Sequence, residues 1–356
     1  MISAAQMPFE IAGQLQLTSE GLRYVGVNSR TICVKHKFGY PSDIPVTESK
    51  YKLIKLLSSL SIYSKYLRKV DILHYHYGCS FSPLAIDVRL NKLLGKKIIV
   101  EFWGSDVRQP SVEKKRNPFY PGADVYGESD QISNRRMRRW AKLTDGVAVI
   151  SDHSFNEQLL EHFKTVYIIG QRVDCSAMDK EVGRNNTQAD SRLTIVHAPS
   201  NQAAKGTDSI EKAIAKLHKK YDFIYKRIEG LSHSEALGEY ARADIVVDQL
   251  MLGCYGVLSC EAMAMGKPTI CYLMEDLAEG YPCGLPIINA NIHTVHDVLE
   301  SLIQQPDQLV AIAKNSKQYA TDVHSHEVVA KRLHYVYKKH LIHDHLPGIF
   351  DLRGMK

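Results

Sequence analysis

The sequence predicts an α/β protein with doubly wound parallel sheets, and three observations support this fold class. Short apolar or β-branched runs alternate with amphipathic stretches of helical length along the chain. Several of the runs, such as residues 98–100 and 147–150, are apolar at every position, which is typical of strands covered on both faces and therefore of a parallel sheet. The length of 356 residues is sufficient for two domains of ordinary size.

The expected elements follow in order from these local patterns. We expect strands where the short apolar runs occur, and helices where apolar residues recur every three or four positions. The expected strands are residues 31–36, 72–77, 97–103, 146–151, 166–170, 193–198, 223–229, 245–249, 269–273 and 286–289. The expected helices are residues 51–68, 134–142, 209–220, 235–243, 295–304 and 327–340.

One polar stretch divides the chain. Residues 180–191 contain Gly and Asn and a single Val, a composition typical of a linker. We therefore expect an N-terminal Rossmann-like domain over residues 1–180 and a C-terminal one over residues 192–325, facing each other across a cleft at the carboxyl ends of their strands. The helix within residues 326–356 is expected to pack back toward the N-terminal domain, with a loose tail beyond Leu346.

Composition and charge limit the classes of protein to consider. Hydrophobic content of 44% and charged content of 24% are those of a globular protein. No apolar run approaches the ~18 residues needed to span a bilayer, and the N-terminus lacks the basic and apolar regions of a secretory signal. The seven Cys have no metal-ligand spacing, which indicates a reducing, cytoplasmic compartment. A net charge of +6 suits an anionic substrate or membrane surface, and no nucleic-acid-binding motif accompanies it.

The most informative stretch is Tyr255-Gly-Val-Leu-Ser-Cys-Glu-Ala-Met-Ala-Met-Gly-Lys-Pro-Thr-Ile270, which predicts a glycine turn, a short helix and a buried strand. The free N–H groups of Gly256, Val257 and Leu258 at the helix start, together with the helix dipole, favour a phosphate. Glu261 lies about one turn further along, where its carboxylate can accept hydrogen bonds from two neighbouring hydroxyls, such as those of a ribose. One element could thus hold both ends of a nucleoside diphosphate. The alternative is a helix packed on a sheet, with a Glu of no special role.

Two loops add to this hypothesis. Lys205 lies between the strand at 193–198 and the helix that opens at Thr207, where an ammonium group can reach a diphosphate at the mouth of the sheet. The alternative is a solvated Lys beside a turn. Leu231 follows the strand at 223–229 and could offer backbone groups to the edge of a base.

Together these blocks resemble the C-terminal domain of GT-B glycosyltransferases of the retaining group 1, or family 4, type, such as those of bacterial polysaccharide biosynthesis. The resemblance covers residues 193–273. It is carried by Lys205-Gly206, by Leu237-x-x-Tyr240-x-x-Ala243-Asp244-Ile-Val-Val, and by Tyr255-Gly-Val…Glu261-Ala-Met-Ala-x-Gly266-x-Pro268. The N-terminal half matches more loosely, through Asp71-Ile-Leu-His74-x-His76 and Gly95-Lys-Lys-Ile…Gly104-Ser-Asp106-Val.

The resemblance implies a GT-B fold and a nucleotide-sugar donor, usually UDP-linked, with no metal or other cofactor. It implies that Glu261 binds the ribose hydroxyls and that Lys205 neutralises the leaving diphosphate. The helix start, from Tyr255 to Leu258, would cradle phosphate, and Leu231 would contact the base through its backbone. It also implies retention by front-face attack, with the leaving phosphate taking the acceptor proton, so that no side chain acts as nucleophile.

The sequence departs from the family pattern at four places. The Glu that usually stands eight positions before Glu261 and contacts the donor sugar is Gly253. An Arg common before Lys205 is Ser200, and the His that often opens the Gly-Ser-Asp stretch is Trp103. The usual Asn-Gly-Val-Asp is Gln171-Arg-Val-Asp174.

Candidate acceptor contacts lie in the N-terminal half. At the carboxyl end of a strand expected to be buried, Asp106 could accept sugar hydroxyls and act in catalysis, Arg108 could bind a phosphate or carboxylate, and Trp103 could stack on a pyranose. The alternative is an Asp that caps a turn and a Trp in the core. Gly13, where the first strand meets the first helix, would let the backbone approach the donor, or simply form a turn.

Two more features leave alternatives open. His74 and His76 share one face of a strand, and we expect packing, or an acceptor contact by His76, rather than metal, because no third ligand has suitable spacing. Residues 50–68 and 134–142 are basic and amphipathic, which suits either an outer helix of an α/β domain or peripheral contact with an anionic membrane, at its inner face.

The sequence therefore predicts a cytoplasmic, metal-independent retaining glycosyltransferase. It would move a hexosyl unit from a nucleotide sugar to a hydroxyl of a glycan or lipid-linked acceptor. The alternatives are a non-catalytic GT-B partner that binds a nucleotide or glycan, and a GT-B sugar-nucleotide epimerase. A two-domain dehydrogenase is disfavoured because no G-x-G-x-x-G follows the first strand.

Overall fold

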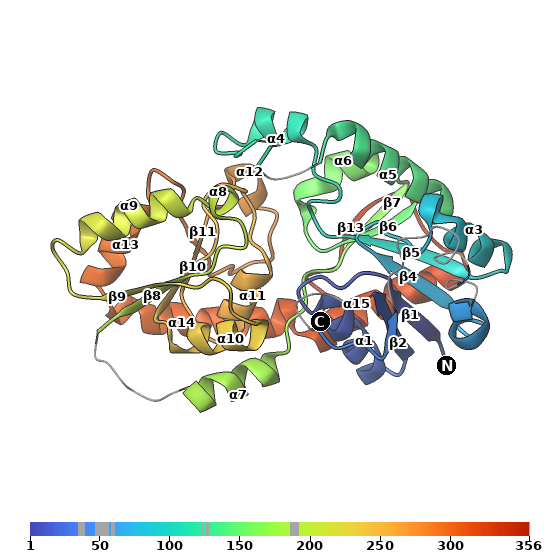
Figure 1. Cartoon of the computed structure of the whole chain (residues 1–356), viewed down its shortest axis with the longest axis horizontal. Helices are drawn as coiled ribbons and strands as arrows, with labels where there is room; N and C mark the ends of the chain where they lie inside the picture. The colour runs from blue at the N-terminus through green and yellow to red at the C-terminus, as the bar shows by residue number, and fades with distance from the viewer. Residues whose placement is uncertain are drawn as a thin grey trace. The chain divides into compact units, whose positions relative to one another are not determined.

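The chain folds into two α/β units (Figure 1). The computed structural model describes residues 1–34, 40–46, 57, 61–122, 124–125, 128–185 and 192–355. Unit 1 comprises Met1–Gln109, Glu128–Arg172 and His326–Lys356, and unit 2 comprises Pro110–Gly127 and Val173–Ser325. The predicted α/β class with parallel sheets is confirmed, because every strand pair in both sheets is parallel.

Unit 1 is built on an eight-stranded sheet of order β13-β7-β6-β5-β4-β1-β2-β3. Its strands are β1 (Ser3–Met7), β2 (Asn28–Val34), β3 (Ile44–Val46), β4 (Ile72–His76), β5 (Lys97–Phe102), β6 (Val147–Ile150), β7 (Thr165–Ile168) and β13 (Gly348–Asp351). Its helices are α1 (Gln14–Tyr24), α3 (Ile86–Leu93), α5 (Asp130–Leu143), α6 (Asn156–Leu160) and α15 (His326–Leu341), with short turns η1 (Tyr63–Leu67), η2 (Pro83–Ala85) and η3 (His153–Phe155).

Alternation along the central strands gives unit 1 one apolar core on each face of the sheet. Ala148 and Ile150 of β6 pack in a cluster with Trp140 of α5, whereas Val147 and Val149 pack in a second cluster with α1 and α15. Figure 1 shows α5 and α6 on one side of this sheet and α1 and α15 on the other. This arrangement explains the continuously apolar strand sequences.

Unit 2 is built on a five-stranded sheet of order β12-β11-β10-β8-β9. Its strands are β8 (Thr194–His197), β9 (Ile224–Arg227), β10 (Ile245–Val247), β11 (Thr269–Cys271) and β12 (Ile288–Asn289). Its helices are α4 (Pro110–Arg116), α7 (Cys175–Asn185), α8 (Gln202–Lys205), α9 (Thr207–Leu217), α10 (His233–Arg242), α11 (Val257–Ala264), α12 (Glu275–Ala278), α13 (Val295–Gln304), α14 (Asp307–Tyr319) and the turn η4 (Ala320–His324).

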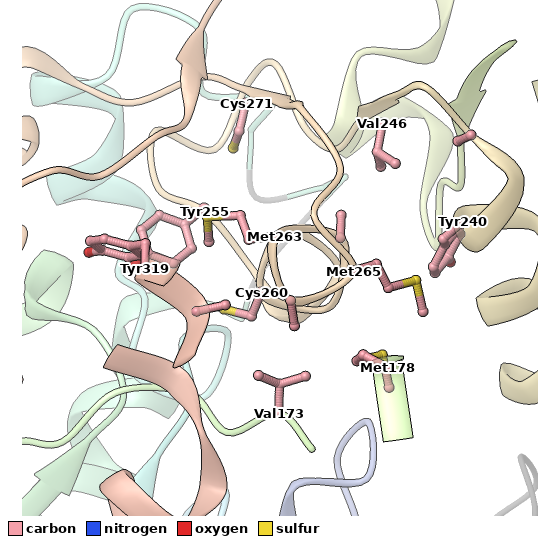
Figure 2. Close-up of a cluster of buried hydrophobic side chains, with 14 of the residues drawn as sticks. Val173, Met178, Tyr240, Val246, Tyr255, Cys260, Met263, Met265, Cys271 and Tyr319 are labelled. Carbon is pink, nitrogen blue, oxygen red and sulfur yellow. The ribbon is translucent and has the colours of Figure 1, made fainter. Parts of the chain in front are cut away.

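Helix α11 lies at the centre of one of the two cores of unit 2. Every residue from Ser259 to Met265 is buried, which is expected of a helix that is apolar on nearly all sides. Figure 2 shows Cys260 and Met263 of α11, and Met265 directly after it, directed outward among Met178 of α7, Tyr240 of α10, Tyr255 and Tyr319. The other core packs α9 and α13 against the opposite face of the sheet.

The structure differs from the sequence-based expectations at both expected irregular segments. Residues 175–185 form α7 and pack against α10 and α11, so the chain enters unit 2 at 172–173 rather than in the expected linker at 180–191, whose residues 186–191 lie outside the described part. The tail is not loose: β13 pairs with β7, and Phe350 stacks on Tyr167 with ring centroids 5.4 Å apart. Residues 326–356 belong to unit 1, where α15 packs on α1.

Two expected elements fall largely on residues that the structure does not describe. The expected strand at 31–36 corresponds to the end of β2, and residues 35–39 lie outside the described part. Of the expected helix at 51–68, only residue 57 and residues 61–68 are described, and they include η1.

Candidate functional site

Helix α11 begins where the sequence predicts it, directly after Gly256. Gly256 is its N-cap residue in an extended conformation, and Val257 and Leu258, which follow it, are partly exposed. The helix interior behind them is buried, so its first turn is the part that a ligand can reach. An anion there would meet the amide groups and the positive end of the helix dipole.

Glu261 lies one turn along α11 and pairs with a residue that the sequence analysis did not identify. Its Oε1 is 2.7 Å from Nε2 of His233, the first residue of α10. Oε2 makes no hydrogen bond within the described part of the chain, so one carboxylate oxygen remains for a ligand. Burial opposes protonation of His233, but the hydrogen bond to Glu261 and its charge outweigh burial and raise the pKa of this imidazole.

The position of His233 is fixed by the local sequence. Ser232 caps α10 in a capping box with Glu235, in which the Ser232 hydroxyl accepts from the Glu235 N–H and the Ser232 N–H donates to the Glu235 carboxylate. This cap sets the first turn of α10 beside α11. Leu231, the predicted base contact, is next to it and its side chain is exposed, which is compatible with a backbone contact to a ligand.

Lys205 ends α8 and forms an ion pair with Asp248, with Nζ 2.6 Å from Oδ1. Asp248 is fully buried; its Oδ2 accepts from Ser259 Oγ at 2.6 Å, and its carboxylate also accepts from the N–H of Gly256. The Gly256 amide, predicted to cradle phosphate, is therefore already bonded within the protein. Burial alone would raise the pKa of Asp248, but the Lys205 charge and these hydrogen bonds lower it below its usual value. The carboxylate therefore ties Lys205 to the start of α11.

Asp248 was not predicted from the sequence, although its position carries a signal. Asp248 directly follows β10, and the carboxyl end of a parallel strand is where ligand-binding residues collect. The Lys205 side chain is only 13% exposed, which excludes the fully solvated alternative. The Lys205 ammonium carries three donors, and one of them is used by Asp248.

The conformation at Gly253 explains why the Glu of the family pattern is absent from this position. Its φ of +79° lies in the left-handed region, and a Cβ at this position would be 2.7 Å from Cγ of Met274. A Glu at position 253 would therefore be strained and would displace Met274. In this conformation the loop cannot present a carboxylate from position 253, so we assign no donor-sugar contact to it.

The side chain of Tyr255, predicted to contact the donor, belongs to the core instead. Its ring is buried against Tyr281, with centroids 4.8 Å apart, and its hydroxyl is 3.0 Å from Nε2 of His324. The Tyr side chain is apolar enough to pack behind α11, so only the backbone of this residue is near the helix start.

A segment from the N-terminal half of the sequence also joins this region. Residues 110–122 and 124–125 belong to unit 2, where the Asn117 amide donates to the Met251 carbonyl at 2.8 Å and the Asn201 amide donates to the Val125 carbonyl at 3.0 Å. Phe119 packs edge-on against Tyr272 at 5.0 Å. Residues 110–125 were predicted to belong to the N-terminal domain, because no local pattern reveals contacts between residues more than seventy positions apart.

The predicted acceptor residues of unit 1 are mostly buried. Asp106 is fully buried, and its Oδ1 accepts from the N–H groups of Trp103 and Gly104 at 3.0 and 2.9 Å, which is the turn-capping role. Burial raises the pKa of Asp106 to about 6. Arg108 is 4% exposed and its guanidinium lies over the ring of Phe155. We assign no acceptor contact to these two side chains, because neither reaches the surface; Trp103 is partly exposed.

His76 is also buried, in a polar cluster that extends across β4 and β5. The Arg172 guanidinium donates to both oxygens of Glu101, at 2.5 and 2.9 Å. His74 Nε2 and His76 Nδ1 lie 3.4 and 3.7 Å from Glu101 Oε2, and burial is the main cause that lowers the pKa of both imidazoles. His76 is 1% exposed, so the expected acceptor contact is not supported.

Glu101 is a possible third metal ligand beside His74 and His76, which the spacing in the sequence did not reveal. The ligand atoms of His74, His76 and Glu101 lie within 4.8 Å of one another. The guanidinium of Arg172, however, already neutralises this carboxylate and would repel a second cation in a dry site. We therefore assign the cluster to packing, which was the favoured alternative.

Gly13 occupies the turn between β1 and α1. Its φ is +78°, and the nearest atom to a Cβ built there is a ring carbon of Tyr40 at 3.5 Å. The left-handed conformation requires Gly and leaves the turn backbone open, as the sequence predicted; a donor contact by Gly13 stays a prediction.

Comparison with known proteins identifies the fold. No protein-family model matches the chain, and no curated protein sequence matches it. Among solved structures, sucrose-phosphate synthase from Thermosynechococcus elongatus is similar with a TM-score of 0.63 and 11% identity, covering 95% of this chain and 99% of that chain. HepE from Anabaena in complex with UDP and glucose has a TM-score of 0.61 and 10% identity, covering 95% and 99%. UDP-GlcNAc 2-epimerase from Neisseria meningitidis, bound to UDP-GlcNAc, has a TM-score of 0.54 and 13% identity, covering 95% and 100%.

These similarities confirm the predicted GT-B fold, since the glycosyltransferases among the neighbours are GT-B enzymes and match almost the whole chain. At such low identities they describe the fold alone. An epimerase is among the neighbours too, so the fold does not separate sugar transfer from epimerisation. Among the described residues, no helix is long and apolar enough to cross a membrane.

Proposed function

We propose that this chain is a GT-B glycosyltransferase that binds a UDP-linked sugar in unit 2 and transfers the sugar, with retention, to a hydroxyl of a glycan or lipid-linked acceptor. One observation carries the proposal: a continuous set of contacts joins Lys205, Asp248, the start of α11 and Glu261. The set places the Lys205 ammonium and the amides of Val257 and Leu258 at one end, and the Glu261 carboxylate, with one oxygen bonded to His233, at the other.

This arrangement suits a nucleoside diphosphate. Glu261 is four residues beyond Val257, which is about 6 Å along the helix axis. The free Oε2 of Glu261 can accept a ribose hydroxyl while Oε1 is held by His233. The two remaining donors of Lys205 and the first-turn amides of α11 can receive the diphosphate.

In the proposed reaction, Lys205 and the first turn of α11 stabilise the negative charge that builds on the leaving diphosphate. Asp248 holds the ammonium group in place, so that little reorganisation accompanies charge development. The leaving phosphate takes the acceptor proton during attack on the same face, so the proposal needs no side-chain nucleophile. It needs no metal ion either.

Two variants test the site separately. Lys205→Met removes a diphosphate contact, and we expect UDP and inorganic diphosphate both to bind about 10- to 100-fold more weakly, as for loss of a hydrogen bond to a charged group. Glu261→Gln removes a ribose contact, so only UDP binding should weaken, by about tenfold. Isothermal titration calorimetry measures both ligands. Lys220→Met, whose Lys is exposed and pairs with Glu300, is the matched control. Unchanged UDP affinity in both site variants would contradict the proposal.

Epimerisation is a second candidate, favoured by the similarity to an epimerase structure bound to UDP-GlcNAc. A non-catalytic nucleotide-binding role is a third, motivated by Gly253 and Ser200 in place of the usual Glu and Arg. Incubation of the purified chain with a panel of UDP-sugars distinguishes the three. Transfer or slow hydrolysis yields UDP, epimerisation yields a new UDP-sugar without UDP, and a non-catalytic chain leaves a bound sugar nucleotide intact.

A further inference from the structure

The outer face of α3 in unit 1 is apolar where a surface helix is normally polar. Ile86, Leu90 and Leu93 recur at helical spacing and are exposed, with Leu93 at 84%. Leu84, just before the helix, is 72% exposed, and Leu94, just after it, is 56% exposed. Contiguous exposed aliphatic groups of this kind mark an interaction surface rather than a random surface residue.

The inward face of the same helix fixes its orientation through Val88, which is buried in the core, and through two buried polar residues. Asp87 is buried, and its carboxylate accepts from Ser82 Oγ and from the N–H groups of Phe81 and Ser82. Asn91, one turn later, is buried as well. Rotation of α3 to bury its leucines would break these hydrogen bonds. The outward direction of the leucines is therefore a fixed feature of the fold.

A basic groove lies beside this apolar face, between α3 and α5. It has a volume of about 770 Å³ and is lined by five cationic side chains against one carboxylate, that of Asp130. The cationic residues are Arg89, Arg135, Arg138, Arg139 and Lys142. None of the five has an ion-pair partner within the described residues. Burial and then the neighbouring Arg136, with Arg89 and Arg135 nearby, lower the pKa of Arg139, as expected where cations are crowded together.

We propose that Leu84, Ile86, Leu90, Leu93 and Leu94, together with this groove, form a docking surface for an anionic lipid bilayer. The aliphatic side chains would enter the boundary between headgroups and acyl chains, and the lipid phosphates would neutralise the crowded cations. The surface lies within unit 1, and the inference is independent of the donor chemistry proposed for unit 2.

Two comparisons of chemistry favour a bilayer over other anionic partners. The exposed apolar residues here are Leu and Ile, which partition into acyl chains, whereas single-stranded nucleic acid is bound on exposed aromatic rings. A free phosphate ligand would use the cations but would leave the aliphatic face unexplained. A bilayer with anionic headgroups uses both.

The test is flotation of the full chain with phosphatidylcholine vesicles, with and without phosphatidylglycerol. We expect binding only with phosphatidylglycerol and a loss of binding as salt increases. Leu90→Ser with Leu93→Ser should lower the partition coefficient at least about tenfold. Arg135→Gln with Arg138→Gln should lower it by about fivefold per charge removed. The exposed pairs Val310→Ser with Ile342→Ser, and Lys216→Gln with Lys219→Gln, are matched controls that should bind like the parent.

Three results would overturn the proposal. The first is no binding to either vesicle by a chain that still binds UDP or keeps its circular dichroism spectrum. The second is equal binding to both vesicle types with no effect of the Arg variants. The third is a dimer in solution that the Leu90→Ser, Leu93→Ser variant dissociates, since the apolar face would then be covered by a second copy.

Discussion

At the scale of single residues, the conformation of Gly253 decides what its site can contain. The left-handed φ of +79° and the contact with Met274 permit Gly and disfavour every larger residue. The carboxylate that the family pattern places there is thus absent for a local structural reason. Asp248, five positions earlier, supplies the buried carboxylate of this region and pairs with Lys205.

A substitution at Gly253 tests this account. Gly253→Ala should destabilise unit 2 by about 1–2 kcal/mol from the left-handed conformation and a further ~1–3 kcal/mol from overpacking against Met274. Gly284→Ala is the matched control: its φ is +83° but nothing lies within 4 Å of a Cβ there, so only the first cost applies. Urea unfolding followed by circular dichroism measures both. Equal losses in the two variants would show that the Met274 contact is unimportant.

At the scale of elements, one buried ion pair connects β5 to the segment after β7. Glu101 is the second-to-last residue of β5, and Arg172 follows β7; both side chains are at most 1% exposed. The Arg172 guanidinium lies 5.0 Å from the centroid of the Trp103 ring. The backbone N–H and carbonyl of Arg172 also bond the side-chain amide of Gln14, which extends this link to α1. Removing one charge leaves the other without compensation in a dry environment.

Arg172→Met should therefore lower the unfolding free energy of unit 1 by about 3–5 kcal/mol. The same change at the exposed Arg23 of unit 1, which pairs with Asp43, should cost about 1 kcal/mol or less. Trp103 and Trp140 are both in unit 1, so intrinsic fluorescence during urea unfolding reports on this unit. A loss at Arg172 no larger than at Arg23 would contradict the assigned role.

At the scale of the whole molecule, buried neutral histidines make stability depend on pH. Burial lowers the pKa of His197 in unit 2 and of His340 in unit 1 to about 4. Both rings are held by neutral hydrogen bonds, His197 to the Val247 carbonyl and His340 to the Ile98 carbonyl, each at 2.8 Å. In the unfolded chain these groups titrate near 6.5, so between pH 6.5 and 4 the unfolded state binds more protons.

These two neutral histidines stabilise the fold at neutral pH and do so less in acid. Their contribution to stability is complete above pH 6.5 and is lost as pH falls toward 4, at about 1.4 kcal/mol per pH unit for each histidine. His197→Gln should reduce the slope for unit 2 by that amount, and His340→Gln should do so for unit 1. Urea unfolding at a series of pH values, by circular dichroism and tryptophan fluorescence, measures the two slopes. An unchanged slope in His197→Gln would show that this ring is not neutral in the fold.

Local sequence was sufficient for much of the fold and for part of the site. Most of the strands, the glycine turn before α11 and the position of Glu261 on that helix depend on short-range periodicity and on Gly and Pro, and these were predicted. The short strands β1 and β3 were not among the expected strands. His233 was missed, because a histidine at a helix start carries no sign of a partner 28 positions away. β13 was missed too, because its pairing with β7 depends on a strand 183 positions earlier.

By itself the sequence determined an α/β chain with two parallel sheets and a helix start suited to phosphate, because the periodicity of apolar residues and the conformational freedom of glycine act over a few residues. Only the tertiary structure decided which polar side chains are available. It pairs Lys205 with Asp248 and buries His76, Asp106 and Arg108, and it turns the leucines of α3 outward. These outcomes depend on burial and on contacts between distant segments, which no local pattern encodes.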